Sequence, residues 1–129
     1  MLELKNISKR FGDKHANKNV DLTLYHGEIL AILGENGSGK TTLLKALEKE
    51  IKYTGEIKIN GKELRTIPSS ELSKIQSLMP QKLPTPHVTA EKLISFGRSP
   101  YLGISGILSV SDKKITESAI EKTGVEKLR

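Results

Sequence analysis

Hydrophobic and polar residues alternate with two different periods in the first half of the chain. Residues 2–4 and 20–24 carry apolar side chains at every second position, which predicts two half-buried strands. Residues 29–33 are apolar on both faces, as a central strand of a parallel sheet would be. Residues 40–50 then carry leucines four residues apart, which predicts an amphipathic helix. The predicted order is therefore strand, strand, strand, glycine-rich loop and helix.

Turn residues organise the stretch that follows the helix. Residues 57–59 alternate again and predict a further strand. Asn60 and Gly61 follow it and are a strong signal for a two-residue hairpin turn. Residues 68–70 can open a short helical turn, and residues 75–79 are predicted to form a strand.

Prolines and capping residues divide the last third of the chain. Three closely spaced prolines break regular structure, so residues 81–87 are predicted to form a loop. Thr89 can cap a short helix that stops at Gly97. Residues 109–112 have the spacing of a capping box, and Gly124 can end the helix that follows.

Composition narrows the class of protein without choosing a function. A length of 129 residues predicts one domain, and 21 basic against 15 acidic residues give a net charge of +6. This charge favours a polyanionic partner, which could be a nucleic acid, an acidic membrane surface or a nucleotide phosphate chain. Because cysteine is absent, disulfides, thiolate metal sites and a cysteine nucleophile are excluded. The longest apolar run has five residues, and the N-terminus has no apolar signal segment, so we expect a soluble cytosolic chain.

Residues 34–41 carry the strongest chemical signal. Their sequence, GENGSGKT, matches G-x-x-x-x-G-K-[ST] at every fixed position. The glycines let the backbone curl, so that successive N–H groups and the N-terminus of the predicted helix can form a cradle for phosphate oxygens. Lys40 supplies a positive charge at the β- and γ-phosphates, and the Thr41 hydroxyl is a ligand for Mg²⁺. A plain glycine-rich turn is the alternative, but the flanking strand and helix favour phosphate binding.

Sequences around this loop resemble the ATP-binding subunit of ABC transporters. The matching segments are Phe11-Gly12, Gly27-Glu28, Glu35-Asn36-Gly37-Ser38-Gly39-Lys40-Thr41-Thr42-Leu43-Leu44, Gly55-Glu56-Ile57 and Met79-Pro80-Gln81. They occur in the family's order and extend over nearly all of the chain. The sequence GRSPYLG at residues 97–103 is similar to the importer branch for iron chelates, haem and cobalamin.

The resemblance implies an α/β fold. Its elements would be a P-loop NTPase core with a parallel sheet, an antiparallel β portion and the start of a helical subdomain. Residues 1–129 would be a truncated, N-terminal portion of an ABC-type ATP-binding domain, with the nucleotide-binding core at 1–88 and the helical subdomain beginning at 89–129.

The resemblance also implies roles for single residues, with ATP and Mg²⁺ as cofactors. The ATP-binding residues would be Phe11, Asn36, Gly37, Ser38, Gly39, Lys40, Thr41 and Thr42. Phe11 would stack on adenine, and Lys40 would act in catalysis together with Gln81. Gln81 would contact Mg²⁺, for which Thr41 would be another ligand, and it would contact the attacking water. It would also sense the membrane subunit.

Structural roles remain open for several of these residues. Phe11 could be a core residue at a strand end, Thr42 an ordinary residue of the first helical turn, and Gln81 a solvated loop residue. Arg98, like Lys82 and His87, is expected to be solvated.

The family's hydrolytic residues have no match in the sequence. The three aspartates, at positions 13, 21 and 112, neither follow an apolar strand nor precede a glutamate, and no Leu-Ser-Gly-Gly-Gln signature occurs. We therefore expect that the parent protein is an ABC-type ATPase and that this chain alone binds nucleotide without turnover.

Three hypotheses for function follow. The first is an ATP-binding importer subunit, which would lie at the inner face of the cell membrane, bind a transmembrane permease and form a head-to-tail homodimer when full length. The second is a non-hydrolysing nucleotide-binding fragment with no transport role. The third is a nucleic-acid-binding protein, which the net charge of +6 motivates but the scattered lysines disfavour.

Overall fold

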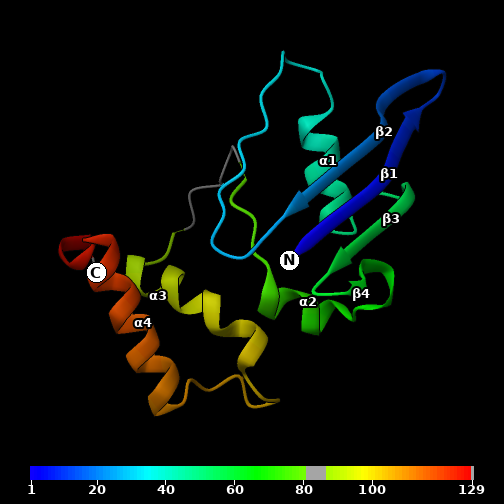
Figure 1. Cartoon of the computed structure of the whole chain (residues 1–129). Coiled ribbons are helices and arrows are strands. Elements are labelled where there is room, and N and C mark those ends of the chain that lie inside the picture. The colour runs from blue at the N-terminus through cyan, green and yellow to red at the C-terminus, as the bar shows by residue number, and fades with distance from the viewer. Residues whose placement is uncertain (81–86, 129) are drawn as a thin grey trace. The chain divides into compact units, whose positions relative to one another are not determined.

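The computed structural model describes residues 1–80 and 87–128, which form two compact units, Met1–Pro68 and Ser69–Arg129 (Figure 1). Gln81 lies outside the described residues. The expected division of the family domain between residues 88 and 89 stays a prediction. Within the described part of the chain, no helix combines the length and apolar character that a membrane crossing requires.

The first unit is built on a four-stranded antiparallel sheet with the order β2-β1-β3-β4. Its strands are β1 (Leu2–Phe11), β2 (Lys14–Leu24), β3 (Thr54–Ile59) and β4 (Lys62–Glu63). The strand predictions for residues 2–4, 20–24 and 57–59 are confirmed. The hairpin turn is also confirmed, because Asn60 and Gly61 have φ angles of 50° and 81°, the pair of left-handed conformations that a type I′ turn requires.

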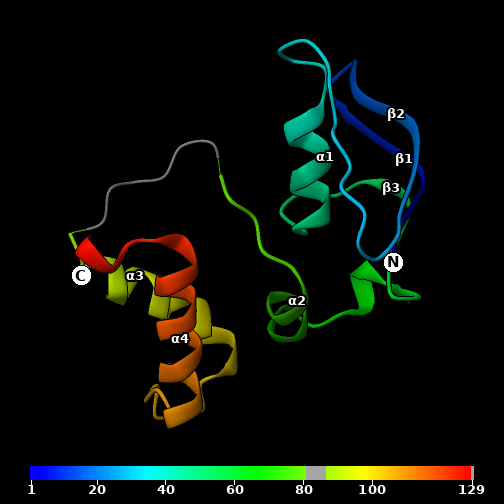
Figure 2. The ribbon, with the colours of Figure 1, turned by 60° about the vertical axis from the view of Figure 1, so that its left-hand side comes forward.

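Helix α1 (Lys40–Leu47) provides the second layer of this unit and lies along one face of the sheet (Figure 2). Leu43 and Ala46 of α1 are buried, as are Ile7 of β1 and Ile57 of β3. A short 3₁₀ segment, η1 (Leu64–Thr66), follows β4. The helix predicted over residues 40–50 is thus confirmed in type but ends earlier, since Lys49 adopts a left-handed φ of 63°.

Residues 29–33 form no strand, so the prediction of a central strand at this place is wrong for this structure. Ile29 is 99% exposed and Leu33 is 89% exposed. A parallel strand that is apolar on both faces needs hydrogen-bonded neighbours and a covering layer on each side. Among residues 1–80 and 87–128 no strand pairs with this run, and all strand pairs are antiparallel.

The second unit is helical. It contains α2 (Ser69–Ile75), α3 (Ala90–Ser95), η2 (Phe96–Tyr101), α4 (Val110–Thr123) and η3 (Glu126–Leu128). The Thr89 cap is confirmed, because its hydroxyl accepts a hydrogen bond from the Lys92 N–H. The capping box and the Gly124 end of α4 are confirmed as well.

The strand predicted for residues 75–79 is wrong. Ile75 is the last residue of α2, and residues 76–80 have no regular structure. The apolar side chains of Leu78 and Met79 are exposed. No strand is described within the second unit, so this short apolar run has no backbone partner there with which to form a ladder.

Arg98 is not solvated, contrary to expectation. Its Nε atom lies 2.9 Å from Oδ1 of Asp112, and its guanidinium stacks 4.0 Å from the centre of the Tyr101 ring. The Tyr101 hydroxyl in turn donates to the carbonyl of Lys74 at the end of α2. Hydrogen bonds from the Ser109 hydroxyl and then from Arg98 hold the pKa of Asp112 below its ordinary value. This cluster fastens η2 to the start of α4 and to α2.

Candidate functional site

A glycine precedes helix α1, and the helix has no side-chain cap. Gly39 is the N-cap, with φ 94° and ψ 6°, and the first turn contains no acidic residue. The first N–H groups of a helix lack partners within the helix, and its N-terminus carries a partial positive charge. The start of α1 therefore offers donors and positive potential to an anion.

Gly39 is fixed against strand β2. A Cβ atom at this position would lie 2.1 Å from the Ala16 carbonyl oxygen and 2.7 Å from Nδ2 of Asn17. The Asn17 amide also donates a hydrogen bond to the Gly39 carbonyl over 3.1 Å. Only glycine fits this close approach and this left-handed φ. The sheet thus sets the position of the loop.

The Lys40 side chain folds back over the loop. Its ammonium donates to the carbonyl oxygens of Gly34 (2.6 Å) and Glu35 (2.7 Å) and lies 3.2 Å from Oγ of Ser38. None of these three oxygens carries a formal negative charge. A phosphate oxygen would accept a stronger, charge-assisted hydrogen bond from the ammonium. Lys40 is therefore suited to bind an anion at this loop.

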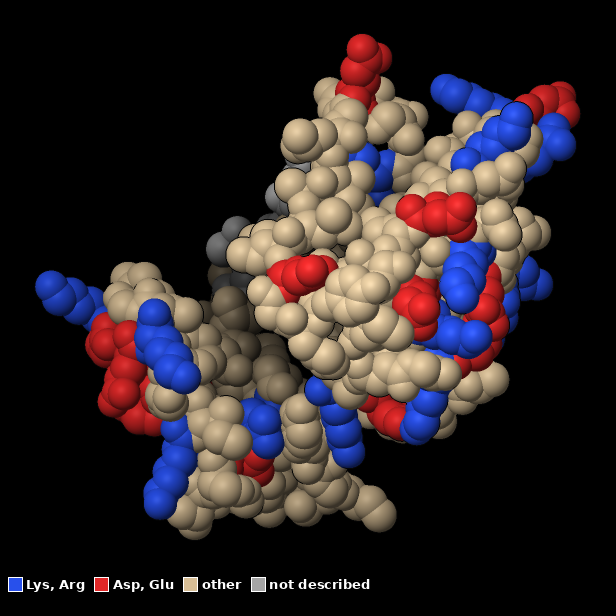
Figure 3. Space-filling model, viewed as in Figure 1, with Lys and Arg blue, Asp and Glu red and all other residues tan. Residues whose placement is uncertain are grey.

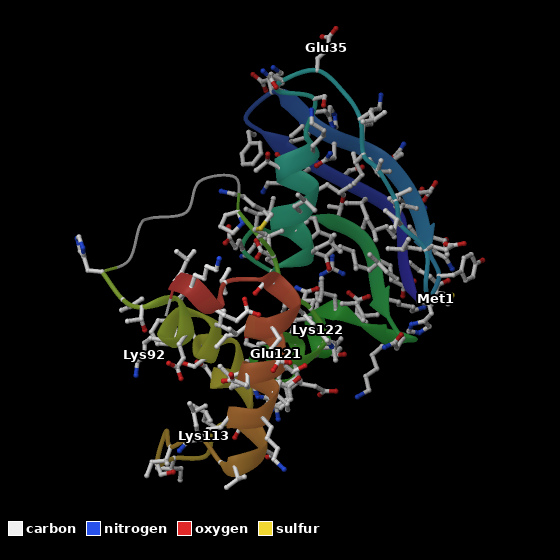
Figure 4. All side chains as sticks on the ribbon, turned by 90° about the vertical axis from the view of Figure 1, so that its left-hand side faces the viewer. Met1, Glu35, Lys92, Lys113, Glu121 and Lys122 are labelled. Atoms are coloured by element: carbon white, nitrogen blue, oxygen red, sulfur yellow. The ribbon has the colours of Figure 1, made fainter. Side chains whose placement is uncertain are left out.

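The remaining loop residues surround the start of α1. Asn36 and Thr41 are exposed, Thr42 is half-buried, and Gly37 has a left-handed φ of 83° with open space around it. Glu35, at the tip of the loop, projects away from the ribbon (Figure 4). The hydroxyl of Thr41 is a suitable oxygen ligand for Mg²⁺ beside a bound phosphate.

Phe11 lies at the end of β1 and is 54% exposed, so it is not a core residue. The Lys9 ammonium lies 4.9 Å from the centre of its ring. An exposed ring can take a stacking partner, and its role with adenine stays a prediction. Gln81 was expected to contact Mg²⁺ and water; it lies outside the described residues, so its role also stays a prediction.

Sequence reasoning missed Asn17. Nothing in the pattern around it marks a polar side chain that would be buried, and its contact with Gly39 joins residues far apart in the chain.

Charged side chains of both signs are interspersed on the first unit, in the view of Figure 3. Lys58 pairs with Glu56 and Arg65 with Glu63, each at 3.1 Å. These basic side chains of the first unit are therefore paired with carboxylates, which disfavours a nucleic-acid contact through them.

Comparisons with known proteins agree with the geometry of the loop. The family model described as "ABC transporter" matches residues 17–129. A petrobactin import ATP-binding protein of Bacillus subtilis is 39% identical over 103 residues, which are 78% of this chain and 41% of that protein. A hemin import ATP-binding protein of Mesorhizobium japonicum is 34% identical over 128 residues, 98% of this chain and 48% of that protein. The relatives also include a putrescine transport ATP-binding protein of Escherichia coli.

A solved structure has the same fold. The dimeric ATP-binding cassette MJ0796, in a post-hydrolysis state bound to ADP and Pi, superposes with a TM-score of 0.75 at 28% identity, covering 99% of this chain and 60% of that one. The chain spans less than half the length of the two import proteins. The family model matches most of the sequence and the cassette superposes on nearly all of the structure, and so the chain belongs to the ABC transporter family.

Proposed function

We propose that this chain is the nucleotide-binding portion of the ATP-binding subunit of an ABC import system. The observation that carries the proposal is the start of α1, where the helix has no side-chain cap and the Lys40 ammonium lies over the loop. A nucleotide triphosphate complements both features, because its phosphates accept from backbone N–H groups and pair with the cation.

Each residue of the site has a part in this proposal. The N–H groups of residues 37–42 hold the phosphate chain, and Lys40 neutralises the β- and γ-phosphates. The Thr41 hydroxyl binds Mg²⁺, which offsets phosphate charge when it is bound. Phe11 stacks on adenine, and Gln81, by the family resemblance, contacts Mg²⁺ and the attacking water.

Hydrolysis and coupling belong to the whole protein in this proposal. The sequence contains no aspartate followed by glutamate, so we propose that the chain alone binds MgATP without turnover. The full-length protein would dimerise, as the dimeric state of the similar cassette supports, and the family resemblance implies a head-to-tail arrangement. It would dock on a transmembrane permease at the inner face of the membrane, and its core would include a parallel sheet.

The proposed cargo is an iron chelate, haem or cobalamin. The sequence at residues 97–103 supports this branch, and so do relatives named for petrobactin and hemin import. One relative is named for the transport of putrescine, a different cargo. Similarity over this part of the domain therefore does not by itself define the transported substrate.

Calorimetric titration with MgATP tests the binding site. Lys40→Ala should weaken binding by about 2–4 kcal/mol, because the phosphates lose their main cation in a largely desolvated pair. Lys45→Ala is the matched control: it removes the same charge from an exposed position of the same helix, where Lys45 pairs loosely with Glu50 at 3.8 Å. Equal affinities for the two variants would contradict the proposed site.

A further inference from the structure

Asn17 is a buried polar residue whose side-chain nitrogen has a hydrogen-bond partner and whose side-chain oxygen has none among the described residues. Only 9% of the residue is exposed, and its Nδ2 atom donates to the Gly39 carbonyl oxygen. A carbonyl oxygen can only accept, so the amide must turn its nitrogen toward Gly39 and its oxygen away. Oδ1 is then buried without a hydrogen-bond partner among the described residues.

This arrangement is unfavourable if Asn17 serves only the stability of the fold. The Gly39 carbonyl already accepts the N–H of Leu43 over 3.0 Å, the first hydrogen bond of α1, and so does not depend on Asn17 for a partner. A buried acceptor without a partner is destabilising, whereas an apolar side chain of similar size leaves no group unsatisfied. The benefit of the amide must then lie in what it does to Gly39.

Two donors hold the Gly39 carbonyl where one would satisfy it. The peptide unit between Gly39 and Lys40 is planar and trans, so the direction of the Gly39 C=O sets the opposite direction of the Lys40 N–H. Glycine is the residue whose backbone rotates most freely, and Gly39 has a φ of 94°. The Asn17 hydrogen bond removes this freedom at the first N–H that the helix offers to an anion.

We propose that Asn17 is a positioning residue of the phosphate-binding loop, which holds the Gly39 carbonyl and thereby aims the Lys40 N–H at the terminal phosphates. This inference rests on the proposed function. It adds a residue of strand β2 to the site, outside the loop motif, and it predicts opposite effects on stability and on binding.

Asn17→Leu in the full 129-residue chain tests the inference. The free energy of opening of the first unit, measured by hydrogen exchange of the β1 and β3 amides, should stay the same or rise, because the variant removes the unpaired oxygen and leaves no other group unsatisfied. The affinity for MgATP and MgADP, measured by calorimetry, should fall about tenfold. In ¹H–¹⁵N spectra, the shift of the Lys40 amide on addition of MgADP should become smaller. A purely structural role would instead lower this free energy of opening and leave the affinity and the Lys40 amide shift unchanged.

Thr116→Val is the matched control. Thr116 is 6% exposed in the second unit and donates to the Asp112 carbonyl, so the change also replaces a buried polar side chain by an apolar one of similar size. It should leave the affinity for MgATP unchanged.

The outcomes separate this inference from the proposed function. If the unsubstituted chain does not bind MgATP, both fail. If it binds and Asn17→Leu binds equally well with the same Lys40 amide shift, the positioning role alone is overturned. Asn17→Ala, which removes the amide without adding bulk, should show the same loss of affinity and provides the test if the leucine variant does not fold.

Discussion

The contact between Gly39 and strand β2 makes a strong prediction for Gly39→Ala. The new methyl group would lie 2.1 Å from the Ala16 carbonyl oxygen, and a backbone atom cannot move aside as the end of a flexible side chain can. The residue would also have to hold a φ of 94°. Gly37→Ala is the matched control, since Gly37 has a φ of 83° but nothing within 4 Å of the added methyl.

The two substitutions differ by one physical effect. Placing an L-residue in the left-handed region costs about 1–2 kcal/mol, and both variants carry this strain. Forcing a methyl group into an occupied space costs about 1–3 kcal/mol more, and only Gly39→Ala carries this cost. We therefore expect a destabilisation of about 2–5 kcal/mol for Gly39→Ala and about 1–2 kcal/mol for Gly37→Ala.

The readout must report the first unit alone, because the chain forms two units and a single unfolding transition is not assured. Native-state hydrogen exchange of the β1 and β3 amides measures the free energy of opening of this sheet. Equal changes for Gly39→Ala and Gly37→Ala would refute the reasoning, because the close packing on β2 would then add nothing to the common backbone strain.

Four further predictions concern single residues. Phe11→Ala should weaken ATP and GTP binding alike by about 1 kcal/mol in calorimetry; a base preference that survives the change would place the base elsewhere. The rate at which the chain releases phosphate from ATP should equal the rate measured for Lys40→Ala. A rate that depends on Lys40 would contradict the proposed lack of turnover. In a full-length protein, Gln81→Ala should leave MgATP affinity within a few-fold and reduce permease-stimulated hydrolysis about tenfold; unchanged stimulation would exclude the role. Hydrogen bonds, first from the Ser109 hydroxyl and then from Arg98, lower the pKa of Asp112 in the folded chain, so the carboxylate stabilises the fold at a pH above its ordinary pKa in the unfolded chain. This contribution should be lost as the pH falls through the lower folded value, and acid titration of Asp112→Asn by circular dichroism should lack that component.

Local signals in the sequence predicted the elements whose geometry depends on a few neighbouring residues. The Asn60-Gly61 turn is confirmed because the left-handed conformations that it needs are properties of those two residues. The caps at Thr89 and Ser109 are confirmed because each hydroxyl meets an N–H three residues further along the chain.

Features that depend on distant parts of the chain could not be predicted in this way. The apolar residues 29–33 have the composition of a buried strand, but burial needs partners, and the described residues provide none. Arg98 looked like a solvated cation because its partner Asp112 lies 14 residues away, across a loop. Asn17 is 22 residues from Gly39, and only the fold brings the two together.

The starts of three helices show how the site differs from the rest of the fold. Helices α3 and α4 are capped by Thr89 and Ser109, whose hydroxyls each accept a hydrogen bond from a backbone N–H of the first turn. The N-cap residue of helix α1 is Gly39, which has no side chain that could accept such a hydrogen bond. A side-chain cap contributes about 1 kcal/mol, and helix α1, which follows the phosphate-binding loop, lacks this stabilisation. A phosphate accepts the same N–H groups and carries more charge than a hydroxyl, and it would therefore serve as the missing cap. Under the proposed function, ligand binding and completion of the helix are one event, which is why the orientation of the Gly39 peptide matters to both.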